Sequence, residues 1–149
     1  SAADMAEAVA ARSEASDIVV MCSAVADYTP THYSAQKVKK SDGELSIPLA
    51  RTTDILHTLG MKKKEGQMLV GFSMETENLI ENSRKKLSKK NADIICANTI
   101  ADGGDTGFAV DTNQVTLITE TEVITLPLCT KEETADLILS HIVELQKEK

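Results

Sequence analysis

Short apolar runs alternate with amphipathic, charged segments through the first two thirds of this 149-residue chain. Residues 18–22, 68–72 and 93–97 form such runs. Runs of this length and character are typical of parallel strands buried on both faces, and the segments between them have helical spacing. The alternation predicts an α/β fold in one domain: a mainly parallel, Rossmann-like sheet with helices on both faces.

Helical spacing and capping signals predict where the helices lie. They cover residues 3–15, a segment from a cap at Thr52 or Thr53 to about residue 62, residues 76–91, and a last helix opened by the capping box Thr130-x-x-Glu133. The inner stripe of the last helix is predicted to be Ala135, Ile138, Leu139, Ile142 and Leu145.

Two antiparallel hairpins complete the predicted fold. One pairs residues 36–40 with 45–49 through a turn at 41–44, and the other pairs 115–119 with 122–126. The chain opens on a helix, whereas a doubly wound domain normally opens on a strand and a glycine-rich turn. We therefore expect residues 1–149 to be the carboxy-terminal portion of a domain whose first strand and glycine-rich turn lie outside this chain.

Composition and charge narrow the class of protein. Hydrophobic residues make up 42% and aromatic residues 3%, with no Trp, so the core must consist of Ile, Leu, Val, Ala and Met. A formal net charge of −7 argues against binding to nucleic acid or membrane surfaces. No apolar stretch approaches the roughly 20 residues that cross a bilayer, and residues 1–15 lack a signal-peptide layout. Three widely separated cysteines indicate buried, reduced thiols in a cytoplasmic protein.

The end of the first strand is the first candidate site. Cys22, Ser23 and Ala24 are small enough to let a ligand approach the backbone, and Asp27 follows them. In open α/β sheets, ligands bind outside the carboxyl ends of the strands. The alternative is that the alanines pack beneath a helix while Asp27 caps a turn, and the residues alone leave both interpretations open.

Two further strands end at the same level. Phe72 ends the second strand, where it could contact a base or belong to the core, and Asn98 ends the third. Glu75 follows at a strand-to-helix turn and is a candidate cap for the next helix. The strand ends are therefore expected to converge on one rim.

Basic side chains supply another signal, because phosphate groups need positive charge. Lys86 and Lys90 are four residues apart, so both project from one face of a helix. The competing interpretation is that they only complement the helix dipole. Lys37, Lys39 and Lys40 could fold over a triphosphate, but by themselves they are better explained as the solvated edge of a hairpin.

Sequence motifs of covalent or metal chemistry are absent. No Gly-x-Gly-x-x-Gly occurs, and residues 103–107 are not followed by the Lys-Ser/Thr of a Walker A loop. His32, His57 and His141 lack metal-ligand spacing, so no metal site built from side chains is expected. With no nucleophile elbow either, a reaction that relies on positioning and on charge stabilisation at phosphate fits better.

A series of sequence blocks runs in order along most of the chain: Ser23-Ala-Val-Ala-Asp-Tyr28, Lys37-Val-Lys-Lys40, Thr53-Asp-Ile-Leu56, Val70-Gly-Phe-Ser-Met-Glu-Thr76, Lys86-x-x-x-Lys90, Asp93-Ile-Ile-Cys-Ala-Asn98 and Asp111-x-Asn113. Together they resemble phosphopantothenoylcysteine synthetase, the coenzyme A pathway ligase that is often fused to a flavin-dependent decarboxylase. The resemblance implies that 4′-phosphopantothenate is joined to L-cysteine. CTP would be cleaved to CMP and pyrophosphate through an acyl-cytidylate, with Mg²⁺ on the triphosphate.

The resemblance also implies roles for individual residues. Lys37 matches a lysine whose charge serves the acyl-nucleotide step, which makes it the implied catalytic residue. Met74 and Thr99 depart from the family pattern, which more often has Ala and Asp there. The implied nucleotide contacts are Cys22, Ser23, Ala24, Asp27, Lys37, Thr53, Asp54, Ile55, Leu56, Phe72, Lys86 and Lys90, with the last two on phosphates.

The sequence also leads to expectations about further domains, dimerisation and alternative functions of the chain. Activity is expected to need the family's missing amino-terminal half, and a fused decarboxylase domain is a further expected partner. A homodimer is expected through the hairpin 36–49, because an isolated hairpin is marginal in water. The rival functions are a non-catalytic nucleotide-binding or regulatory module and a nicotinamide-dependent oxidoreductase, which the lack of a dinucleotide fingerprint disfavours. No residue dictates CTP over ATP.

Overall fold

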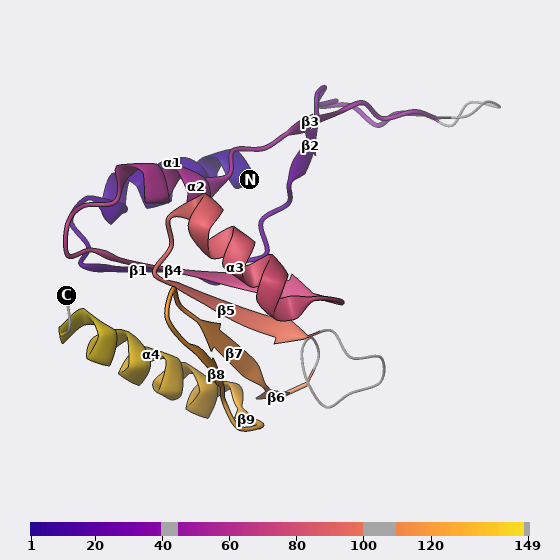
Figure 1. Cartoon of the computed structure of the whole chain (residues 1–149). Coiled ribbons are helices and arrows are strands. Elements are labelled where there is room, and N and C mark those ends of the chain that lie inside the picture. Colours follow the sequence, from indigo (N-terminus) through magenta and orange to yellow (C-terminus); the bar gives the residue numbers. More distant parts are fainter. Residues whose placement is uncertain (40–44, 100–109, 148–149) are drawn as a thin grey trace.

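The computed structural model describes residues 1–39, 45–99 and 110–147, and a five-stranded sheet lies at its centre (Figure 1). The strand order is β1-β4-β5-β7-β8; the first three run parallel, and the last two extend the sheet antiparallel. Because β1, β4 and β5 share one direction, their carboxyl ends meet at one edge. The strands are β1 (Ile18–Met21), β4 (Met68–Glu75), β5 (Ile94–Thr99), β7 (Val115–Ile118) and β8 (Val123–Thr125).

Helices cover both faces of this sheet. Three of them, α1 (Ala2–Ser13), α2 (Ile55–Lys62) and α3 (Leu79–Lys90), lie on one face, and α4 (Lys131–Lys147) lies on the other (Figure 1). This layering confirms the predicted α/β class, with mainly parallel strands and an antiparallel hairpin at the β7–β8 edge. In the described ranges, no helix combines the length and the apolar character that a membrane span requires.

Core packing follows the alternation of side chains along β4, the second strand in the sheet order. Met68 and Val70 are buried in a cluster that α4 completes with Ile138 and Ile142. Leu69 belongs to a separate cluster with residues of α1 and α2. Successive residues of β4 therefore pack against helices on opposite faces of the sheet, and this is why the sequence of the strand is a continuous apolar run.

The predicted hairpin at residues 36–49 is wrong in its position. The antiparallel pair is β2 (Tyr28–Pro30) with β3 (Leu49–Arg51), and the described residues 36–39 and 45–48 form no strand. We call residues 28–39 and 45–51 the arm, which projects from the layered body (Figure 1). Apolar side chains at 45 and 47 resemble a strand pattern, but they are exposed and have no layer of this chain to pack against. The predicted turn 41–44, Lys40 and residues 103–107 lie outside the described residues.

Helices α2 and α3 begin at other residues than the sequence predicts. Asp54 caps α2, in place of Thr52 or Thr53, and its carboxylate accepts a hydrogen bond from the backbone N–H of His57 at 3.0 Å. The next helix begins at Leu79, not at residue 76, because β4 stays paired with β5 as far as Glu75.

In α4, the predicted capping box is confirmed and the predicted stripe is partly wrong. Thr130 accepts from the Glu133 N–H at 3.2 Å, and the Glu133 carboxylate accepts from the Thr130 N–H at 2.9 Å. Ile138 and Ile142 are buried as predicted, whereas Ala135 and Leu139 are exposed. Thr134 is the buried side chain one turn before Ile138, so the buried residues repeat every four positions. A short ladder of β6 (Thr112–Asn113) with β9 (Cys129–Thr130) precedes the helix.

Helices α2 and α3 approach each other closely at Gly60. A Cβ atom at this position would overlap the backbone carbonyl of Lys90, so the contact requires a residue without a side chain. Two polar contacts stabilise this approach of the helices. Asn91 Nδ2 donates to the Gly60 carbonyl at 2.8 Å, and His57 Nδ1 lies 3.1 Å from the carbonyl of Lys89. The end of α3 is thereby held against α2.

We predict that Gly60→Ala destabilises the protein by about 2–3 kcal/mol, because the added methyl group must push two backbones apart. This loss outweighs the gain of about 1 kcal/mol in helix propensity. Met61→Ala on the exposed side of the same helix is the control and should change stability by less than about 0.5 kcal/mol. Urea unfolding measures both variants, and equal midpoints for the two would contradict the prediction.

Candidate functional site

A groove of about 270 Å³ lies at the edge where the parallel strands end. Its walls come from the segment after β1, the loop that enters α2, the first turn of α2, and one face of α3. This is where ligands bind in open α/β sheets. The lining residues are Met21, Ser23, Val25, Ala26, Asp27, Thr52, Thr53, Asp54, Ile55, Leu56, Phe72, Lys86, Lys90 and Ile95.

Most of the residues expected to contact a nucleotide line this one groove. Cys22 and Ala24 flank Ser23 but do not line it, and Lys37 lies on the exposed arm. The tertiary structure thus joins segments 67 residues apart in the chain, from Ser23 to Lys90. The predicted residues that line the groove are Ser23, Asp27, Thr53, Asp54, Ile55, Leu56, Phe72, Lys86 and Lys90. Their roles toward a ligand stay predictions.

Two walls of the groove are tied together by Thr52. Its backbone N–H donates to the carbonyl of Asp27 at 2.9 Å, and its hydroxyl donates to the carbonyl of Ala26 at 2.6 Å. The segment after β1 and the loop before α2 are therefore held in one register. The local sequence predicts Thr52 only as a helix cap, and it carries no signal that links Thr52 to a residue 26 positions earlier.

Lys90 reaches from the end of α3 to the start of α2, where it forms an ion pair with Asp54. Partial burial raises the pKa of the Asp54 carboxyl, but the hydrogen bonds from Lys90 and from the His57 N–H outweigh it. The pKa of Asp54 therefore lies below its ordinary value, and the carboxylate is ionised at neutral pH. The close approach at Gly60 places these two elements within reach of each other.

Lys86 pairs with a different carboxylate, that of Glu75 at the end of β4, with 2.6 Å between Nζ and Oε1. The other oxygen of Glu75 accepts from Asn82 Nδ2 at 3.2 Å. Glu75 is therefore a partner of α3 and not its cap, because α3 begins only at Leu79, after Asn78. Each lysine predicted to bind phosphate thus already has a carboxylate partner.

Phe72 lies within β4, since the strand continues to Glu75 beyond the predicted end at residue 72. Its ring is partly buried against the core cluster on the α4 side, and the residue also lines the groove. Phe72 is therefore both a residue packed against the core and a residue of the groove wall. At the end of the neighbouring strand β5, Asn98 accepts a hydrogen bond from Asn113 Nδ2 at 3.4 Å.

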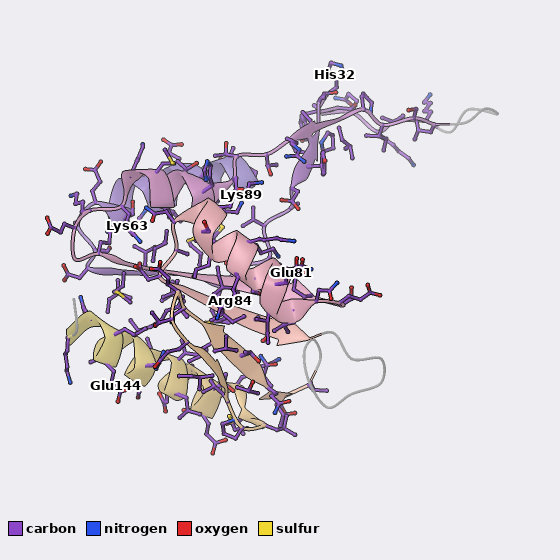
Figure 2. The ribbon with its side chains drawn as sticks, viewed as in Figure 1. His32, Lys63, Glu81, Arg84, Lys89 and Glu144 are labelled. Atoms are coloured by element: carbon purple, nitrogen blue, oxygen red, sulfur yellow. The ribbon has the colours of Figure 1, made fainter. Side chains whose placement is uncertain are left out.

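Cysteines and histidines contribute no common centre to the described structure. Burial raises the pKa of the Cys96 thiol to about 12, whereas Cys22 is exposed, which corrects its predicted burial in a core strand. His32 lies on the arm, far from the layered body (Figure 2). Within residues 1–39, 45–99 and 110–147, no three His, Cys, Asp or Glu side chains gather as a metal site.

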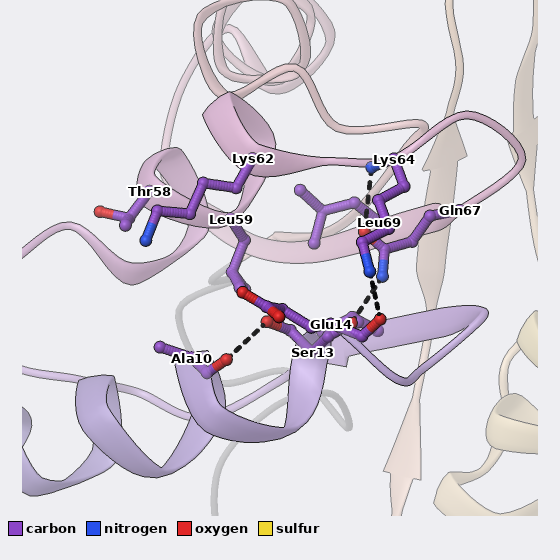
Figure 3. A pocket seen from close by; sticks show the side chains of 10 residues that line it. Ala10, Ser13, Glu14, Thr58, Leu59, Lys62, Lys64, Gln67 and Leu69 are labelled. Carbon is purple, nitrogen blue, oxygen red and sulfur yellow. Dashed lines mark hydrogen bonds between the residues drawn. The ribbon is translucent and has the colours of Figure 1, made fainter.

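A second, smaller pocket of about 70 Å³ lies between α1, α2 and the starts of the strands, away from the groove. Two of its polar side chains, Gln67 and Lys64, hydrogen-bond backbone carbonyls at the end of α1 (Figure 3). Gln67 Nε2 donates to the carbonyls of Ser13 and Ser16 at 2.7 and 2.6 Å, and Lys64 Nζ donates to the carbonyl of Glu14 at 2.7 Å. The pocket is too small for an ordinary ligand, and its contacts fasten α1 to the body.

Fold and site together define a Rossmann-like α/β domain with a groove at the carboxyl ends of its parallel strands, which two lysines and two aspartates line. The chain belongs to the DNA/pantothenate metabolism flavoprotein C-terminal domain family, whose sequence model matches residues 1–145. This match confirms the resemblance drawn from the sequence blocks.

Relatives with known names extend the comparison. The coenzyme A biosynthesis bifunctional protein CoaBC of Bacillus subtilis (strain 168) is 46% identical over 149 residues, which is 99% of this chain and 36% of the relative. A crystal structure of the C-terminal domain of CoaBC has a TM-score of 0.79 at 41% identity, covering all of this chain and 64% of that one. A Cab2 variant in complex with phosphopantothenate-cysteine shares the fold, with a TM-score of 0.61 at 18% identity, over 88% of this chain and 44% of that one. This chain spans about a third of the length of the curated relatives that it matches.

Proposed function

We propose that this chain supplies the CTP-binding groove of a phosphopantothenate–cysteine ligase in coenzyme A biosynthesis. The observation that carries the proposal is the convergence of Asp27, residues 53–56, Lys86 and Lys90 on one groove. These residues belong to blocks that resemble the synthetase family, and the family match covers the groove completely. The 46% identity to CoaBC of Bacillus subtilis supports the pathway.

The proposed reaction proceeds in two steps and needs no nucleophile from the protein. The carboxylate of 4′-phosphopantothenate attacks the α-phosphorus of CTP, the bond to the β-phosphate oxygen breaks, and pyrophosphate leaves. The cysteine amine then attacks the acyl carbon, loses a proton, and displaces CMP. Lys86 and Lys90 would stabilise negative charge on the phosphates, which is the main task in phosphoryl chemistry of this kind.

Lys37 is proposed to serve the second step, through charge near the acyl-cytidylate. It is exposed on the arm and does not line the groove of its own chain. The role therefore requires the arm to bring Lys37 over a groove.

Mg²⁺ is proposed to accompany the triphosphate. Asp27 fits as its oxygen ligand, because Asp27 is an exposed carboxylate of the groove and forms no ion pair within the described residues.

We predict that Lys86→Gln and Lys90→Gln each weaken CTP binding about 10- to 100-fold, because each removes a charge-assisted hydrogen bond to phosphate. Lys37→Gln should instead slow formation of the amide and change CTP affinity little. Lys85→Gln is the matched control, since Lys85 lies on the same helix and pairs with Glu81 outside the groove. Calorimetric titration and single-turnover kinetics separate the two effects, and equal loss of affinity in all three groove and arm variants would remove the division of roles.

A non-catalytic nucleotide-binding module is the second candidate function. It is favoured by one observation: both groove lysines are engaged by carboxylates while Lys37 lies elsewhere. A thermal-shift titration with CTP and Mg²⁺, followed by a pyrophosphate-release assay with 4′-phosphopantothenate and cysteine, distinguishes the two. We expect stabilisation and release from the intact protein; stabilisation without release would favour the module.

We further propose that the arm pairs two copies of this chain. Val38, Leu45, Ile47 and Leu49 expose apolar side chains on it, and an exposed antiparallel pair gains stability from a packing partner.

Replacing Ile47 by Asp should shift the protein from dimer to monomer in sedimentation velocity at micromolar concentration, because a charge would be buried in the interface. Met61→Asp is the control, because Met61 is also an exposed apolar residue but lies on α2. A wild-type protein that sediments only as a monomer would rule the dimer out.

A further inference from the structure

The two lysine–carboxylate pairs of the groove are built in opposite ways. In the first pair the carboxylate is the enclosed member: the Glu75 side chain is 13% exposed and that of Lys86 43%. In the second pair the lysine is enclosed: the Lys90 side chain is 17% exposed and that of Asp54 47%. The two ammonium groups, four residues apart on α3, therefore meet a ligand differently.

Glu75 lies behind Lys86 and leaves the lysine open toward the groove. Its carboxylate is held on the second oxygen by Asn82, whose amide also donates to the carbonyl of Glu77 at 3.1 Å. An enclosed carboxylate needs its cation, so Glu75 keeps the ammonium of Lys86 in place, while the more exposed lysine keeps N–H donors available toward the groove.

Asp54 lies on the outer side of Lys90. The enclosed ammonium has this exposed carboxylate as its ion-pair partner, and both residues line the groove. We infer that the Asp54 carboxylate competes with phosphate oxygens for Lys90, and that a polyphosphate displaces it on binding. This inference rests on the proposed function, and it makes Asp54 a specificity-determining residue rather than an attractive contact.

Charge and geometry favour such an exchange. The Asp54 carboxylate is 47% exposed, so water can solvate it after it leaves, and the enclosed ammonium of Lys90 stays paired because a phosphate oxygen takes its place. Its other hydrogen bond, from the His57 N–H at the start of α2, keeps the carboxylate at the rim of the groove after the exchange. A ligand with one negative charge gains little over the carboxylate that it replaces, whereas a polyphosphate brings several charges to both lysines. Asp54 therefore selects for polyphosphates.

The test removes the competing charge and keeps the helix cap. Asn caps a helix about as well as Asp, so Asp54→Asn retains α2. Inorganic triphosphate serves as the probe because it has no base or ribose, and EDTA keeps divalent cations out of the titration. We expect Asp54→Asn to bind triphosphate about fivefold more tightly than the wild type, because the Lys90 ammonium then has no carboxylate competing for it. Binding of acetate should tighten by a larger factor, so the preference for polyphosphate should narrow.

Matched variants separate competition from general electrostatics. Glu81→Gln removes one negative charge from an exposed ion pair of α3 outside the groove and should leave triphosphate affinity unchanged. In a Lys90→Gln background, Asp54→Asn should change the affinity less than twofold, because there is then no ammonium to compete for. A full fivefold gain in that background would overturn the inference.

Further outcomes distinguish a failure of the competition by Asp54 from a failure of the proposed CTP-binding function. If Lys90→Gln weakens binding while Asp54→Asn binds equally or less tightly than wild type, the proposed groove stands and competition by Asp54 is refuted. If neither the wild type nor Asp54→Asn binds CTP or triphosphate, the proposed function and the inference fall together. Asp54→Ser, a second capping residue, repeats the test, and urea unfolding verifies that each variant is folded.

Discussion

The close contact of α2 with the end of α3 is the constraint on which the groove depends. Only a residue without a side chain allows the backbone at position 60 to meet the carbonyl of Lys90. That contact aligns the start of α2, with the cap residue Asp54, opposite the face of α3 that carries Lys86 and Lys90. Layer packing against the sheet sets the height of both helices, and the glycine sets the distance between them.

Electrostatics then shapes what the groove can hold. The chain as a whole is acidic, with a net charge of −7, yet two lysines face one groove. Each is balanced by a carboxylate from another element, Glu75 from β4 and Asp54 from the α2 cap. The two lysines are therefore locally charge-balanced, and the opposite burial of the two ion pairs makes the lysines unequal. The family match, over residues 1–145, includes every residue that lines the groove.

Sequence reasoning located much of this site, for physical reasons that differ between residues. Lys86 and Lys90 could be paired because helical spacing alone places them on one face. Ser23 and Asp27 could be placed because a buried strand delivers its carboxyl end to a sheet edge. Glu75 and Thr52 were missed as partners because their contacts are 11 and 26 residues away, beyond any local periodicity. The role expected for Lys37 was implied only by the family resemblance, and in the structure Lys37 lies on the arm, outside the groove.

Local pattern by itself determined the α/β class, the strands at 18–22, 68–72 and 93–97 to within a few residues, and the capping box of α4. These depend on side-chain alternation, helical period and short-range hydrogen bonds, which act within one element. Only the tertiary structure decided which lysine is enclosed and where the arm pairs. Those outcomes depend on burial and on partners from distant segments, and neither is encoded in the spacing of neighbouring residues.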